Sequence, residues 1–320
     1  MPAGIKVLAT QYIREMFGDP NSATSFFAPG FHWHGPSVLG RSGGAAEQQH
    51  AFFAALKDAF PDLSCTTEAP VAEKSRVALR WTARGTHTGS ALGAATGRGV
   101  LFTGIHLLDF NAGGKIVELW QQWGQMGLLQ QINAMPFIGG PGSSLPGPDI
   151  EHEDTFAPNP ICAETDEMAA NKELLHRLFD NVINRNDLSL TESCIADDIR
   201  DHNPGPSDQP GRKGIQEVCK ILRQAFPDLN GAIDDLVAEG DRIVIRWNVR
   251  GTNTCRCGGI GPTLRAIAGS GIDIVRVART PDSTPRVTDR WGNSDDTGIL
   301  LQLGLIPAWP DSAVPALLAV

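Results

Sequence analysis

Long apolar segments are absent from the sequence: no run approaches the ~20 apolar residues that a helix needs to cross a bilayer. We therefore expect no membrane partner. The first four residues, Met-Pro-Ala-Gly, include no charged region followed by an apolar core, so the sequence predicts no signal peptide. A cytoplasmic protein is the resulting expectation.

Positive charge is also scarce. The 320 residues include 27 Lys and Arg against 36 Asp and Glu, a formal net charge of −9, and no dense basic cluster. Because nucleic acids and anionic membranes attract basic surfaces, we expect neither as a partner. The composition, 41% hydrophobic and 20% charged, is that of a globular protein, and the length favours two domains.

Cysteine supplies no framework for the fold. The six cysteines are Cys65, Cys162, Cys194, Cys219, Cys255 and Cys257. They do not recur at matching places in the two halves, so we expect reduced thiols and no shared disulfides. Cys255 and Cys257 are too closely spaced for a usual zinc knuckle, and we expect no metal. A Gly-x-Ser-x-Gly nucleophile motif is missing as well, and we expect no cofactor.

What the sequence does contain is a long internal repeat. Three short motifs recur 166 residues apart: Ala-Phe-Pro-Asp-Leu at 59–63 and 225–229, Arg-Trp at 80–81 and 246–247, and Gly-Thr at 85–86 and 251–252. A repeat of this length determines the architecture before any local pattern does. It also allows the two copies to be compared position by position.

Each copy is predicted to contain two helices followed by about four long antiparallel strands. Helical spacing of apolar residues predicts helices over 5–17, 44–59, 169–184 and 214–225. Strand patterns cover 63–71, 76–87, 99–111 and 115–123, and then 229–238, 241–252, 269–277 and 286–293. This order predicts an α+β unit with helices covering one face of a curved sheet. The predicted divisions are domain 1–136, a Pro- and Gly-rich linker 137–164, domain 165–310 and a tail 311–320.

Several stretches together resemble the SnoaL-like polyketide cyclases, within the nuclear-transport-factor-2-like superfamily. In the first copy they are 59–63, 85–89, 113–120 and 127–131; in the second they are 201–204, 211–214, 239–241, Trp291 and 300–304. The resemblance covers nearly all of both halves. It implies two tandem cone-shaped α+β barrels with one pocket each. Members of this family usually pair sheets between subunits, so the chain is expected to form that pair within itself as a pseudo-dimer, with further homodimerisation left open.

The resemblance also implies an acid/base residue at the last strand. In the family, an Asp that transfers protons follows a Trp by four residues. Trp291 and Asp295 keep this spacing, whereas Gly124 occupies that place after Trp120. Strand alternation places Trp291, Asn293 and Asp295 on one face. If that face lines the pocket, desolvation beside Trp291 would raise the pKa of Asp295 and make it a better base. The alternative is that Asp295 caps the helix that follows.

A second polar position lies on the strand that precedes the last one. The Gly-Ile pairs at 104–105 and 271–272 align His106 with Asp273. Asp273 is expected to share a proton with Asp295 as two carboxylates with separated pKa values. A structural salt bridge to Arg246 or Arg276 is the competing interpretation.

Further polar residues are candidates for the pocket wall. His202, and with it His34, either donates to a substrate carbonyl or fastens a turn. His87 becomes Asn253 in the second copy, and either lines a pocket or ends a strand. The histidines at 32, 34, 87 and 106 are a conceivable metal cluster without family precedent. The complete set of predicted substrate-binding residues is Trp291, Asn293, Asn253, Trp247, His34, His87, His106, Trp120 and Gln122, with Asp295, Asp273 and His202 as predicted catalytic residues.

By resemblance, the expected function is cofactor-independent acid/base catalysis on a small, largely apolar carbonyl metabolite. Aldol-type ring closure of a poly-oxo ester is the first expectation. Because one scaffold supports several reactions, epoxide hydrolysis, dehydration and isomerisation remain alternatives, as does non-catalytic binding of an apolar ligand. The divergent pocket positions indicate that the second copy carries the chemistry, while the first holds a histidine-lined pocket or only completes the assembly.

Overall fold

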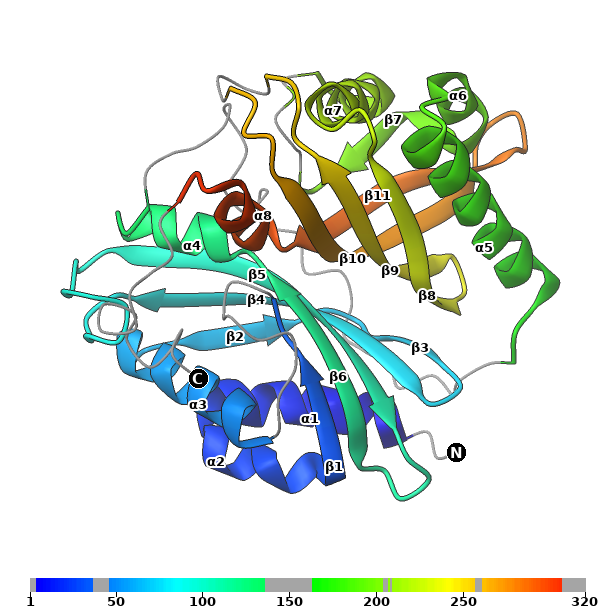
Figure 1. Ribbon diagram of the computed structural model, residues 1–320. Coiled ribbons are helices and arrows are strands. Elements are labelled where there is room, and N and C mark those ends of the chain that lie inside the picture. The colour runs from blue at the N-terminus through cyan, green and yellow to red at the C-terminus, as the bar shows by residue number, and fades with distance from the viewer. Residues whose placement is uncertain are drawn as a thin grey trace. The chain divides into compact units, whose positions relative to one another are not determined.

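The computed structural model describes residues 4–36, 46–135, 163–203, 207, 209–256 and 261–306 (Figure 1). The chain divides into two compact units: the described residues 4–135 belong to unit 1 and 163–306 to unit 2. The predicted linker, except its last two residues, and the predicted tail lie outside the described residues. Among the helices described, none is both long and apolar enough to cross a bilayer.

Unit 1 is an open sheet with helices on one face. Its elements are α1 (Gly4–Gly18), α2 (Pro20–Ala23), η1 (Thr24–Phe26), β1 (Phe27–His34), α3 (Ala46–Ala59), β2 (Ser64–Thr67), β3 (Val71–Glu73), β4 (Arg76–Thr86), β5 (Gly99–Phe110), β6 (Ile116–Trp123) and α4 (Gln125–Gln131). The strand order is β1-β6-β5-β4-β2, with β3 paired to β4. All neighbours are antiparallel except β1 and β6.

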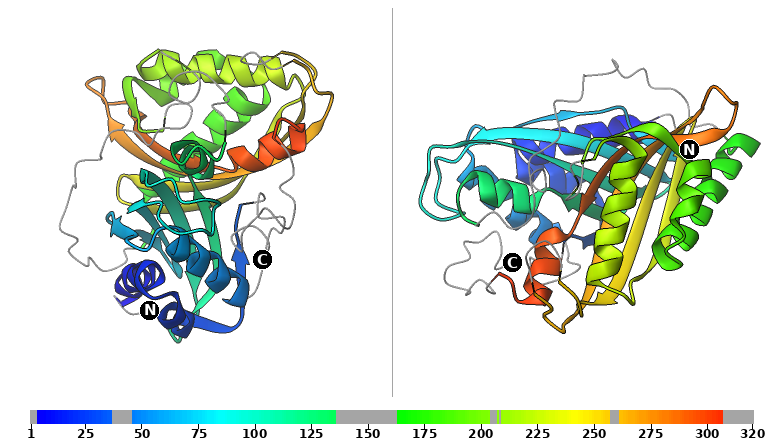
Figure 2. Two further views of the ribbon diagram at one scale, coloured as in Figure 1. Left: turned by 90° about the vertical axis from the view of Figure 1, so that its left-hand side faces the viewer. Right: turned by 90° about the horizontal axis from the view of Figure 1, so that it is seen from above.

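Unit 2 repeats this plan. It contains α5 (Asp166–Leu178), the π-helix η3 (Phe179–Asn184), η4 (Leu188–Leu190), α6 (Thr191–Cys194), β7 (Ile195–Asp201), α7 (Gly211–Ala225), β8 (Asn230–Glu239), β9 (Arg242–Thr252), β10 (Ala266–Arg279), β11 (Pro285–Ser294) and α8 (Asp296–Leu303). The strand order is β7-β11-β10-β9-β8, again with the first pair parallel. Helices α5 and α7 lie on one face of the sheet (Figure 2). The predicted tandem α+β architecture is therefore confirmed.

The sequence patterns missed the parallel edge strand of each unit, β1 and β7. In β1, Pro29 and Gly30 interrupt the alternating pattern of a strand. The structure absorbs them in a bulge between Phe27 and His32, where Gly30 adopts a φ of +76°. The predicted strand 63–71 is also divided, into β2 and β3.

The repeated motifs have structural tasks that explain why both copies keep them. The carboxylate of Asp62 accepts hydrogen bonds from the Thr86 amide (2.7 Å) and hydroxyl (2.7 Å). Asp228 accepts the corresponding bond from the Thr252 amide at 2.6 Å. The Phe-Pro-Asp-Leu and Gly-Thr motifs thus fasten the turn after each long helix to the end of β4 or β9.

The Arg-Trp motif places an indole across a glycine. A Cβ atom on Gly104 would lie 2.2 Å from a ring carbon of Trp81, and one on Gly271 would lie 2.2 Å from a ring carbon of Trp247. Only glycine leaves room for the indole at these two paired positions. The repeat therefore preserves the same ring position inside each unit.

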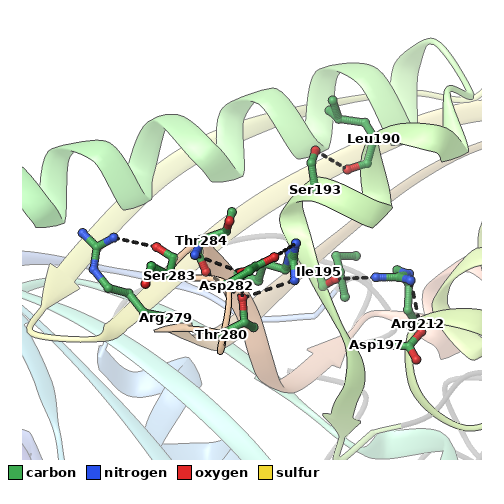
Figure 3. A network of polar contacts seen from close by, with 11 residues as sticks. Leu190, Ser193, Ile195, Asp197, Arg212, Arg279, Thr280, Asp282, Ser283 and Thr284 are labelled. Atoms are coloured by element: carbon green, nitrogen blue, oxygen red, sulfur yellow. Dashed lines mark hydrogen bonds and ion pairs between the residues drawn. The ribbon is translucent and has the colours of Figure 1, made fainter.

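Figure 3 shows polar contacts of unit 2 in the turn between β10 and β11 and near the start of α7. In the turn between β10 and β11, Asp282 accepts from the Thr284 amide at 3.0 Å and pairs with Arg286 at 2.7 Å. At the start of α7, Arg212 donates to the Ile195 carbonyl at 3.0 Å and pairs with Asp197 at 3.0 Å. These contacts fix the hairpin and the edge strand that position the polar residues described next.

Candidate functional site

A set of charged residues lies on the helix-covered face of the second sheet. Asp273 of β10 pairs with Gly292 of β11 and Ile245 of β9. Directly paired residues point to the same side of a sheet, and alternation adds Arg290 to that side. This inner face is the one that packs against α5, since Ile245 belongs to the hydrophobic cluster that includes Leu175.

Arg290 joins two carboxylates at the centre of this face. Its Nε donates to Oδ2 of Asp273 at 3.1 Å, and its Nη2 donates to Oδ1 of Asp273 at 3.2 Å. Its Nη1 lies 3.1 Å from both carboxylate oxygens of Asp201, at the end of β7, and 3.5 Å from the Asn203 carbonyl. Guanidinium has five N–H donors, so one Nη2 hydrogen is left without a partner among the described residues.

Burial and ion pairing act in opposite directions on Asp273 and Arg290. Burial raises the pKa of Asp273, while Arg290 and a hydrogen bond from Trp247 favour its charged form. Burial also acts against the charge of Arg290, but Asp273 and Asp201 outweigh it and hold the pKa of the guanidinium above its usual range. The side chains of Arg290, Asp201 and Asp273 keep 29%, 14% and 13% exposure, so all three remain in contact with solvent.

Gly292 makes the Asp273–Arg290 pair possible. A Cβ atom at this position would lie 2.3 Å from Oδ1 of Asp273 and 2.7 Å from Nη2 of Arg290. Any side chain here would displace one partner of the pair. The backbone amide of Gly292 in turn donates to Oδ1 of Asn203 at 3.1 Å, which connects the loop after β7 to the cluster.

In unit 1, aromatic rings fill the corresponding space between the sheet and its helices. Phe17, Phe52, Phe53 and Trp123 are at most 4% exposed. At the corresponding positions unit 2 has Ile183, Val218, Cys219 and Ser294, all partly exposed. Helix α3 buries six residues, including both phenylalanines, whereas α7 buries only Gly214 and Ala225. Smaller side chains thus leave the interior of unit 2 accessible, while that of unit 1 is closed.

The histidines of unit 1 do not form a cluster. His106 is fully buried among the rings of Tyr12, Phe53 and Trp81, and burial lowers its pKa to about 3. His34 stacks on Trp120 with ring centroids 5.2 Å apart. Trp120 pairs with Leu107, the neighbour of His106, so His34 and His106 lie on opposite faces of the sheet. Within the described ranges, no group of three or more His, Cys, Asp or Glu residues is arranged to hold a metal ion.

Several predicted site residues of unit 2 also lie on the outer face. Trp291 pairs with Ile274, and Asn293 pairs with Ile272. Ile272 and Ile274 flank Asp273 in β10, so Trp291 and Asn293 lie on the opposite face from Asp273. His202 follows them, because its ring stacks on Trp291 at 4.5 Å. The expectation that Trp291, His202 and Asp273 line one pocket is therefore not met: adjacent positions of a pleated strand point to opposite sides. Trp120 and Gln122 are the matching outer-face residues of unit 1, paired with Leu107 and Ile105.

Arg246 and Arg276, the arginines expected to pair with Asp273, bind other carboxylates. Arg246 contacts Asp234 at 3.0 Å and Asp235 at 2.5 Å. Arg276 pairs with Asp241 at 3.4 Å, and its guanidinium carbon lies 5.8 Å from the Trp291 ring centroid. Both side chains start on the outer face, so the partner of Asp273 is Arg290 instead.

Asn253 and His87 hold loops. The Asn253 amide donates to the Ala225 and Cys255 carbonyls at 3.1 and 3.0 Å, and its oxygen accepts from the Thr263 amide at 2.8 Å. His87 is 1% exposed and lies 3.1 Å from the Thr96 hydroxyl. In both units this position connects the ends of two strands to neighbouring loops.

Asp295 is buried and acts as a helix cap. Its side chain, in a residue 3% exposed, accepts a hydrogen bond from the Gly298 amide at 3.1 Å at the start of α8. The cap interpretation is thus observed, and the catalytic role of Asp295 stays a prediction. Sequence reasoning missed Arg290 and Asp201. The available signal was the alternation of Arg290, Gly292 and Ser294 along β11, which places all three on one face of the sheet.

The comparison with protein families agrees with this architecture. The SnoaL-like polyketide cyclase family matches residues 7–132 and again 173–303. Among solved structures, TsrD from Streptomyces laurentii is 26% identical and covers 45% of this chain and 100% of its own, with a TM-score of 0.39. IdmH from Streptomyces antibioticus is 27% identical and covers 42% of this chain and 98% of its own, with a TM-score of 0.36.

AclR from Streptomyces galilaeus is 25% identical and covers 44% of this chain and 99% of its own, with a TM-score of 0.37. None of the curated proteins compared with the chain matches it. The two family matches together span most of the sequence, and each covers one sheet with its helices. The chain belongs to the SnoaL-like polyketide cyclase family, whose domain it contains twice in tandem.

Proposed function

We propose that unit 2 is a cofactor-independent acid/base catalyst for a small, largely apolar carbonyl metabolite, and that it closes a ring by an intramolecular aldol-type reaction. The observation that carries this proposal is the Asp273–Arg290–Asp201 cluster on an accessible inner face. Carboxylates with a raised pKa transfer protons near neutral pH, and a fixed guanidinium stabilises developing negative charge. Family membership supports the choice of reaction class.

The proposed reaction needs one proton acceptor and one donor to oxygen. A carboxylate of the site removes a proton from a carbon activated by neighbouring carbonyls, and the C–H electron pair forms an enolate. The unpartnered Nη2 hydrogen of Arg290 holds the enolate oxygen. The enolate carbon then bonds to a second carbonyl carbon, whose oxygen takes up a proton. Atoms balance, because the product is an isomer of the substrate.

Asp273 and Asp201 position Arg290 in this scheme, and Asp273 keeps the partial exposure that proton exchange with a substrate requires. Asp295 and His202 remain predicted participants from the family resemblance. Asp295 is a buried helix cap and His202 lies on the outer face. Both places make direct contact with a substrate beside Arg290 more difficult. The intramolecular pseudo-dimer and the cytoplasmic location also stay predictions.

Epoxide opening is the second candidate, because one arginine joins two carboxylates. In that reaction an ionised carboxylate activates a water molecule, a protonated one donates to the epoxide oxygen, and the arginine keeps their pKa values apart. The observed Asp201–Arg290–Asp273 order provides these groups. The product would be a diol that contains one added water.

Two probes separate the reactions in the full-length protein. Deuterium uptake at the α-carbon of α-tetralone, followed by mass spectrometry, reports proton abstraction next to a carbonyl. Hydrolysis of styrene oxide, followed by chromatography, reports epoxide opening. Asp273→Asn should lower the rate of the reaction the protein performs by roughly 100-fold, and Asp198→Asn, an exposed carboxylate of β7, is the control.

The outcomes decide between the proposals. Exchange with α-tetralone that depends on Asp273 supports the aldol-type function, whereas hydrolysis of styrene oxide alone supports the second candidate. An unchanged rate in Asp273→Asn contradicts both. If α-tetralone binds by calorimetry and neither probe reacts faster than in buffer, unit 2 is a binding module.

A further inference from the structure

Two consecutive aspartates follow β11, and the structure gives them opposite tasks. Asp295 is 3% exposed, and its carboxylate accepts a hydrogen bond from the Gly298 amide. Asp296 is exposed, and its Oδ1 accepts a hydrogen bond from the Ser294 hydroxyl at 2.6 Å. No other hydrogen bond involves the Asp296 carboxylate among the described residues, so its Oδ2 is available to a ligand.

Ser294 connects Asp296 to the inner face. Ser294 pairs with Gly271, which places it on the same side of the sheet as Gly292 and Arg290. It also stands where unit 1 has Trp123, so the serine leaves open the space that an indole fills there. The hydroxyl therefore holds the Asp296 carboxylate at the rim of the accessible interior.

The charge on Arg290 acts on Asp296 as well. Desolvation raises the pKa of Asp296, while the Ser294 hydrogen bond and Arg290 favour its ionised form. Asp296 as a residue is nevertheless exposed. Arg290 is paired with Asp201 and Asp273, and its charge also favours the ionised form of Asp296.

These carboxylates differ in how many of their oxygens are already hydrogen-bonded. Asp273 and Asp201 each place both oxygens against Arg290. Asp296 has one oxygen bound to a neutral hydroxyl and one uncommitted. A general base needs an uncommitted lone pair within reach of the substrate proton, and Asp296 meets this condition better than Asp273 and Asp201 do.

We propose that Asp296 is the general base of unit 2, with Arg290 as the donor to the enolate oxygen and Asp295 as a helix cap. This assignment rests on the proposed function and names the residue that takes the proton. It is independent of the family resemblance, which points to Asp295. The first residue of a helix is also a favourable place for any carboxylate, so the test must separate a chemical role from a structural one.

The proton moves as follows. The α-carbon of the substrate loses its proton to Oδ2 of ionised Asp296, and the electron pair of the broken bond becomes the enolate held by Arg290. After the carbon–carbon bond forms, the new alkoxide takes the proton back from the Asp296 carboxyl group. The site returns to its starting state without any further reactant.

Neighbouring substitutions provide the test, with deuterium uptake by α-tetralone as the assay. In Asp296→Asn the turnover rate should fall by at least ~100-fold, as for loss of a general base, while the Kd of α-tetralone from calorimetry stays within about threefold. Asp296→Glu should recover part of the rate. Added acetate should accelerate Asp296→Ala, which a purely structural role of Asp296 does not predict.

Asp295→Asn is the rival variant, and Asn also caps helices. The proposal expects Asp295→Asn to lose at least ~10-fold less activity than Asp296→Asn. Loss of activity in Asp295→Asn with an active Asp296→Asn overturns the assignment in favour of Asp295. Full activity in both, with an inactive Asp273→Asn, overturns it while the proposed function stands. No exchange by the unmodified chain overturns the proposed function and the role of Asp296 with it.

Discussion

Arg290 and Asp273 form a bidentate ion pair between adjacent strands, with hydrogen bonds of 3.1 and 3.2 Å between Nε and Oδ2 and between Nη2 and Oδ1. Two parallel bonds fix the plane of the guanidinium as well as its position. The pair lies directly over Gly292, the residue opposite Asp273. The absence of a side chain at 292 is therefore a requirement of the site.

Gly292→Ala should break this pair. The new Cβ atom would lie 2.3 Å from Oδ1 of Asp273, so the carboxylate or the guanidinium must move. We expect the turnover of the reactive probe to fall at least tenfold and the free energy of unfolding to fall by ~1–3 kcal/mol. Gly261→Ala is the control, because no atom lies within 4 Å of its added Cβ. Equal activity of the two variants would show that the pair does not serve catalysis.

Refilling the interior of unit 2 with the residues of unit 1 should block the site. Cys219→Phe copies Phe53 and Ser294→Trp copies Trp123. Because each adds a ring where the unit 2 side chain is partly exposed, we expect the double variant to fold and to bind α-tetralone at least ~10-fold more weakly. Calorimetry measures the binding, and Cys219→Ser is the matched control. Unchanged binding in a folded double variant would place the ligand elsewhere.

His106 should make unit 1 sensitive to acid. Burial lowers its pKa to about 3, below the ordinary value of 6.5, so between these values the unfolded chain binds a proton that the folded chain rejects. Stability therefore falls as pH drops below 6.5, by about 2 kcal/mol at pH 5. His106→Leu should remove this loss. Urea unfolding of unit 1 at pH 7 and pH 5 measures it, with the exposed His32→Leu of the same unit as control. An equal pH dependence in the His106 variant would contradict the prediction.

Asp62 and Asp228 should contribute charge-dependent stability, one to each unit. The amides of Thr86 and Thr252 donate to them and lower the pKa of both carboxyls. A lowered folded pKa means that the contribution is present above the unfolded pKa and disappears as pH falls through the folded one. Asp62→Asn should thus lower the urea midpoint of unit 1 at pH 6, and Asp228→Asn that of unit 2, with smaller differences at pH 3. A urea midpoint unchanged at pH 6 would show that the neutral amide oxygen of Asn stabilises the turn as well as the carboxylate does.

Much of the fold could be predicted from the sequence because the repeat constrains it twice. The motifs around Asp62 and Asp228, and the indoles over Gly104 and Gly271, depend on short-range geometry that residue identity specifies. The parallel edge strands could not be predicted in the same way. Their pairing joins segments distant in the chain, and Pro29 and Gly30 interrupt the regular pattern of one of them.

The site was predictable only in part. Asp273 was identified by comparing it with His106, and the structure places it at the centre of the inner face. Trp291 and His202 were expected beside it and lie on the other face. Arg290, its actual partner, carried no motif. Composition and spacing identify polar residues in strands, but they do not say which strand positions stand opposite one another.

The sequence by itself determined a tandem α+β protein of the SnoaL-like family, with a shared scaffold and two divergent interiors. Only the tertiary structure decided which interior is accessible and which carboxylates surround Arg290. The physical reason is the two-residue period of a strand. A shift of one residue, such as the bulge between Arg276 and Val277, moves every following side chain to the opposite face. That register depends on long-range pairing, which the order of residues along one strand does not specify.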